Sequence, residues 1–118
     1  MTGDMNRIQV TEYAARIESL IHQWGGGLFG VTDLLTFQKE DLLLSPELVE
    51  KHPVALSIGY HLSDAILEDI EDRPTPLYFQ HYQRVNILLD TLGLVITNVL
   101  QDLGYRAVPI PASQLVDW

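Results

Sequence analysis

Two stretches of the sequence carry side chains that could hold a small molecule. The first is QHYQRVN, in which His81 brings a titratable imidazole, Tyr82 a phenol, Arg84 a guanidinium and Asn86 an amide. Together these groups can donate and accept hydrogen bonds and place positive charge beside a ligand. On an ideal helix His81 and Asn86 lie about 140° apart, so the four do not form one tight site by themselves. The alternative is an ordinary helix surface with Tyr82 in the core.

The second stretch is PIPASQ, residues 109–114, which follows the last predicted strand. Ligands of parallel α/β sheets lie outside the carboxyl ends of the strands. Ala112 and Ser113 are small enough to let a ligand approach the backbone, and Gln114 adds an amide. We therefore predict that Ser113 and Gln114 join His81, Tyr82, Arg84 and Asn86 in lining a cleft for a cofactor. The alternative is an exit loop made rigid by its two prolines.

The catalytic residues are unknown at this stage, and no metal site is predicted. The sequence has no cysteine, which excludes thiolate nucleophiles, cysteine zinc sites and iron–sulfur ligation by these residues. The four histidines lack the spacing of a helical metal-binding pair, and the serines lack a nucleophile-elbow motif. Gly25-Gly26-Gly27 follows a predicted helix rather than a strand, so it is interpreted as a helix stop and not as a phosphate loop.

The elements that must position these residues can be traced from caps, glycines and apolar spacing. Helices are predicted at 11–24, after Ser45-Pro46, from Ser63 to about 72 and, longest, at about 77–103. Strands are predicted at 28–33, 54–60 and 105–110. Because strands alternate with helices, we expect an α/β fold with a small, mostly parallel three-stranded sheet covered by helices. Residues 1–118 then form a single domain, with residues 1–9 disordered.

Composition narrows the partners and the compartment. The net charge of −9, with scattered basic residues, argues against binding of a nucleic-acid backbone. The sequence shows no apolar run of membrane-span length and no signal-peptide pattern, so we expect a cytoplasmic protein without a membrane partner. The apolar ending LVDW is typical of a chain cut where a fold should continue. We therefore expect an incomplete functional unit, and a homo-oligomer whose interface includes residues 109–118.

Three segments together carry a family resemblance. LSDAILEDIEDRPTPLYFQHYQRVN, the leucine-rich helix after it, and GYRAVPIPASQLVDW resemble the N-terminal part of the epoxyqueuosine-reductase-like iron–sulfur proteins. That resemblance implies an oxidoreductase with a ferredoxin-type domain holding two 4Fe–4S clusters. In the epoxyqueuosine reductases proper, electrons pass from the clusters to a cobalamin.

The resemblance implies that this chain is a scaffold or cleft domain, inactive alone and without a cofactor of its own. The clusters, and possibly cobalamin, would be bound with a C-terminal cluster domain beyond Trp118, which would be the partner of this chain. The alternative function is a non-catalytic, self-associating protein-interaction module.

Overall fold

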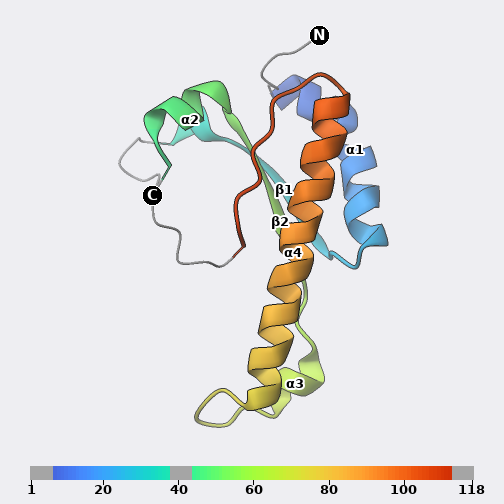
Figure 1. Cartoon of the computed structure of the whole chain (residues 1–118), viewed down its shortest axis with the longest axis vertical. Coiled ribbons are helices and arrows are strands. Elements are labelled where there is room, and N and C mark those ends of the chain that lie inside the picture. The colour runs from blue at the N-terminus through green and yellow to red at the C-terminus, as the bar shows by residue number, and fades with distance from the viewer. Residues whose placement is uncertain (1–6, 38–43, 113–118) are drawn as a thin grey trace.

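The computed structural model describes residues 7–37 and 44–112. In chain order the elements are α1 (Arg7–Gln23), β1 (Leu28–Asp33), the short 3₁₀ turn η1 (Leu34–Thr36), α2 (Pro46–Lys51), β2 (Val54–Gly59), α3 (Asp64–Glu68) and α4 (Pro76–Asp102). They form an elongated molecule of 49 × 34 × 21 Å, with α4 along its length and α3 at one end (Figure 1). Of the residues 1–9 expected to be disordered, 1–6 lie outside the described residues and 7–9 belong to α1.

The two strands pair antiparallel, so Asp33 at the end of β1 lies opposite Val54 at the start of β2. The prediction of a mostly parallel, three-stranded sheet is therefore wrong. A parallel connection would have to travel back along the whole strand, about 20 Å for six residues. The chain instead returns to the same end of the pair, where the Leu34 N–H donates to the Pro53 carbonyl at 2.7 Å.

The predicted third strand, 105–110, is also absent from the described part of the chain. Residues 106–112, which we name the strap, run without regular structure between α4 and α2 (Figure 1). Pro109 and Pro111 have no N–H to give to a neighbouring strand, which limits any ladder to the first residues of this segment. The strap is tied to α4 instead, because the Ala112 N–H donates to Asp90 Oδ1 at 2.8 Å.

The longest helix, α4, matches the predicted 77–103 within one residue at each end. The Thr75 hydroxyl accepts the Tyr78 N–H at 3.1 Å, Pro76 lies in the first turn, and Gly104 follows the helix with a φ of 92°. The buried side chains of α4 are Val85, Leu92, Ile96 and Leu100. Tyr82, assigned to the inward face from its spacing, is 39% exposed. Its turn of α4 extends past the strands, beside α3 (Figure 1).

The core lies where α1 and the second half of α4 meet the strand pair. Ile17 and Ile21 of α1 pack with Ile96 and Leu100 of α4. Side chains packed against this cluster come from both strands and from the start of the strap: Phe29, Val31, Val54, Leu56, Ile58, Tyr105 and Ala107. The second half of α4 is therefore anchored in the core, whereas its first turns lie beside α3.

Candidate functional site

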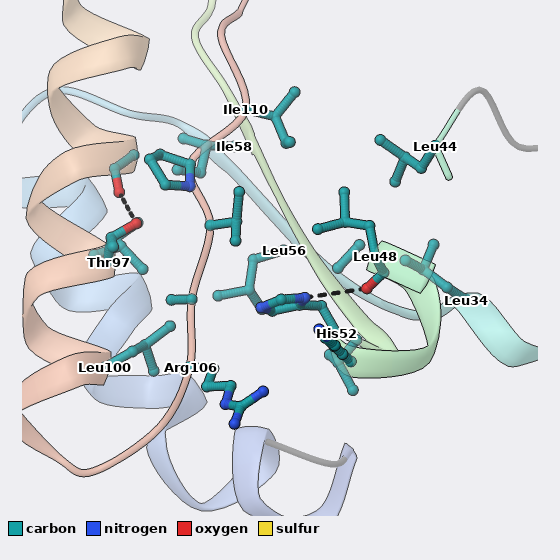
Figure 2. Close-up of a pocket in the computed structure, with 18 of the residues that line it drawn as sticks. Leu34, Leu44, Leu48, His52, Leu56, Ile58, Thr97, Leu100, Arg106 and Ile110 are labelled. Carbon is teal, nitrogen blue, oxygen red and sulfur yellow. Dashed lines mark hydrogen bonds between the residues drawn. The ribbon is translucent and has the colours of Figure 1, made fainter. Parts of the chain in front are cut away.

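A partly open cavity of about 320 Å³ lies beside the core, bordered by α2, β2, the second half of α4 and the strap (Figure 2). Its apolar lining consists of Leu34, Leu44, Leu48, Val49, Val54, Ala55, Leu56, Ile58, Leu89, Gly93, Ile96, Leu100, Ala107, Val108, Pro109, Ile110 and Ala112. Its polar lining consists of Lys51, His52, Thr97 and Arg106. A mostly apolar cavity with a few convergent polar groups is the usual form of a small-molecule site.

The strap closes one side of this cavity and packs directly against α4. Gly93 has no side chain, and a Cβ built there would lie 3.7 Å from the Cβ of Pro109. One turn earlier, the Asp90 carboxylate accepts the Ala112 N–H. These two contacts hold the strap along α4, and the cavity lies between the strap, β2 and α2 (Figure 2).

Two polar side chains of the lining have their orientation set by backbone carbonyls. His52 Nδ1 lies 3.1 Å from the Leu48 carbonyl oxygen, and since a carbonyl only accepts, Nδ1 is the donor. The second ring nitrogen, Nε2, has no hydrogen-bond partner among the described residues, so it remains for a ligand. The Thr97 hydroxyl donates to the Gly93 carbonyl at 2.7 Å, and this bond fixes the orientation of the Thr97 side chain. Figure 2 shows both hydrogen bonds.

The end of α2 places Lys51 and His52 beside the cavity. Ser45 caps the helix through its hydroxyl, which accepts the Leu48 N–H at 3.2 Å. His52 ends the helix, and its backbone N–H donates to the Leu48 carbonyl at 2.9 Å. Pro53 follows and cannot continue the helix. Hydrogen bonds from both the backbone N–H and the ring therefore fix the position of His52.

The residues predicted from the first stretch lie elsewhere, in the first turns of α4 near α3 (Figure 1). His81 Nε2 accepts the Ser63 N–H at 3.0 Å, and its ring meets that of Tyr60 edge-on with centroids 6.3 Å apart. These contacts tie the residue that caps α3 to α4, which gives His81 a structural role.

The other residues of that stretch are spread around the helix. Tyr82 stacks on Tyr78 with ring centroids 6.1 Å apart, Arg84 is exposed and Asn86 is half-buried. None of the four predicted residues lines the cavity. Ser113 and Gln114 lie outside the described residues, whereas the PIPA part of their stretch contributes Pro109, Ile110 and Ala112 to the cavity wall.

Sequence reasoning missed Lys51, His52 and Arg106 as residues that line the cavity. Lys51 and His52 end a short helix and Arg106 follows the long one, so nothing in their spacing connects them. The one available signal was charge, because this acidic chain has few basic residues. Two of them, Lys51 and Arg106, lie next to segments that form the cavity wall.

Two pairs of a histidine and a carboxylate lie outside the cavity, and both are exposed. His61 Nε2 lies 2.8 Å from Asp64 Oδ1, and His22 Nε2 lies 3.5 Å from Glu18 Oε1. Within residues 7–37 and 44–112, no group of three histidine, cysteine, aspartate or glutamate side chains is placed to hold a metal ion. In the same ranges, no helix has the length and apolar character needed to cross a membrane.

Comparison of the chain with protein-family models, with curated proteins and with solved structures gives no match.

Proposed function

We propose that this chain is a ligand-binding domain, the scaffold and one wall of a cleft, without a complete catalytic site of its own. The observation that carries the proposal is the cavity of about 320 Å³ between α4, β2, α2 and the strap. This is also the role that the resemblance to the N-terminal part of the epoxyqueuosine-reductase-like proteins implies. The cytoplasm is the proposed compartment, and cell fractionation would test it.

The lining favours binding over chemistry. Its side chains with a titratable or hydroxyl group are Lys51, His52, Thr97 and Arg106. The Thr97 hydroxyl already donates to a backbone carbonyl, and among the described residues no carboxylate lines the cavity to orient His52 as a base. Desolvation of an apolar ligand is then the main source of affinity, at about 0.8 kcal/mol for each buried methylene.

The cofactors implied by the resemblance do not fit these residues. Iron–sulfur clusters are held by cysteine thiolates, and the sequence has none. At about 320 Å³ the cavity is at the lower end of the size range of small-molecule sites, far too small to enclose a corrinoid. We therefore assign the cavity to a smaller ligand.

The test is a titration of the isotope-labelled chain with straight-chain alcohols, followed by amide NMR. Decanol should produce saturable shifts at Gly93, Thr97 and Ala107, and affinity should rise about fourfold for each methylene until the cavity is full. Shifts without saturation, or shifts centred on exposed apolar residues such as Leu94, would exclude the cavity as the site.

A matched pair of variants makes the test specific. Thr97→Met should extend a longer side chain into the cavity and weaken decanol binding, since Thr97 lines it. Asn98→Met places the same side chain at the next position of α4, which is exposed and away from the lining. Equal loss of binding in both variants would show that the effect comes from helix disruption and not from filling the cavity.

Self-association is the second candidate function, and exposed apolar side chains on α4 favour it. Leu77, Phe79 and Ile87 are 53%, 55% and 55% exposed, and Leu94 is 61% exposed. Large exposed apolar patches commonly mark an interface. Light scattering over a range of concentrations would test this, and a monomer at high micromolar concentration would exclude it. Truncation after Val108 would show whether residues 109–118 contribute.

A further inference from the structure

The charge of the cavity differs from that of the whole chain. The sequence has 16 acidic and 7 basic residues, for a net charge of −9. Among the described residues, however, no aspartate or glutamate lines the cavity, whereas Lys51 and Arg106 do, together with the imidazole of His52. A local basic site in an acidic protein attracts an anion that the rest of the surface repels.

His52 and Arg106 lie at the same end of the cavity. His52 and Arg106 also line a second, shallower hollow with Gln101, Gly104, Tyr105 and Ala107, so both lie at the boundary between the two spaces. In Figure 2 Arg106 is drawn toward the bottom of the view, below His52, while Ile110 and Leu44 lie toward the top. The cavity therefore has a basic end that reaches solvent and an apolar end beneath the strap.

The geometry of these groups suits an acid. The Leu48 carbonyl fixes the His52 ring through Nδ1, which leaves Nε2 for a ligand. A guanidinium carries five N–H donors in a planar fork that matches a carboxylate. Arg106 can therefore keep its contact within the protein and also donate to a ligand. Lys51, one residue before His52, adds a flexible positive charge to the lining.

Resting on the proposed function above, we propose that the ligand is an amphiphilic acid: an apolar chain with one terminal carboxylate. The chain occupies the apolar end beneath Pro109 and Ile110, and the carboxylate lies at His52, Arg106 and Lys51. The small volume of the cavity favours a medium-length chain over a long lipid.

The experiment compares three probes with the same apolar chain: decanoate, decanol and decyltrimethylammonium, each below its micelle concentration. Decanoate should bind about tenfold more tightly than decanol, as expected for hydrogen bonds to a charged group, and the ammonium should bind most weakly. Non-specific attraction to a chain of net charge −9 gives the reverse order, with the ammonium first.

Variants locate the carboxylate. Arg106→Gln should weaken decanoate binding about fivefold, since the side chain is exposed and partly screened, and should leave decanol binding unchanged. Arg84→Gln removes the same charge from an exposed position outside the cavity and should change neither affinity. Arg106→Lys should restore part of the loss, because it keeps the charge without the fork.

The outcomes separate this inference from the proposed function. Equal binding of decanol and decanoate, or an Arg84→Gln effect as large as that of Arg106→Gln, would overturn the inference and leave the apolar cavity as a binding site. Failure of all three probes to bind saturably would overturn both.

Discussion

Gly93→Ala should stabilise the protein, although Gly93 lies directly beneath Pro109 of the strap. Gly93 lies inside α4, where glycine costs about 0.5–1 kcal/mol relative to alanine through backbone entropy. The added Cβ would lie 3.7 Å from Pro109 Cβ, an ordinary van der Waals contact that needs no movement. We expect the free energy of unfolding to rise by about 0.5–1 kcal/mol and the Tm by about 4 °C or less.

The assay is urea unfolding followed by far-UV circular dichroism, with Gly26→Ala as the matched control. At Gly26 a Cβ would collide with the side chain of Ile21 and would lie 3.2 Å from the Ile21 carbonyl oxygen. Ile21 is fully buried in the core and cannot move aside, so this variant should be less stable. A loss of more than about 0.5 kcal/mol for Gly93→Ala would refute the reasoning and show that the strap lies closer to α4.

Three further predictions concern helix α4 and the strap. Leu92→Ala, at a fully buried position, should cost about 2–5 kcal/mol in urea unfolding, whereas Leu94→Ala, 61% exposed, should stay within about 0.5; equal costs would mean that the buried face is wrongly assigned. Thr75→Ala should cost about 1 kcal/mol through loss of the helix cap, and Thr75→Ser should restore most of it. Asp90→Ala should speed hydrogen exchange of the Ala112 amide, whereas Asp90→Asn keeps an acceptor and should speed it less; unchanged exchange in both would show that this bond does not hold the strap.

Local signals predicted most of the elements because caps and glycines act within a few residues. Ser45 and Thr75 begin α2 and α4 as expected, and the glycine after each long helix marks its end. Two boundaries were less accurate. α1 begins at Arg7, ahead of the predicted Thr11, and α3 ends at Glu68, short of the predicted residue 72. Helix ends without a strong cap depend on packing as well as on local sequence.

The sequence by itself determined the positions of β1 and β2, the length of α4 and the acidity of the chain. Only the tertiary structure decided that the strands run antiparallel, that residues 105–110 form no third strand, and that Lys51, His52 and Arg106 share one cavity. The reason is the range of the forces involved. Capping and apolar periodicity are properties of neighbouring residues, whereas strand direction and the approach of residue 106 to residue 52 depend on how distant segments pack around a common core.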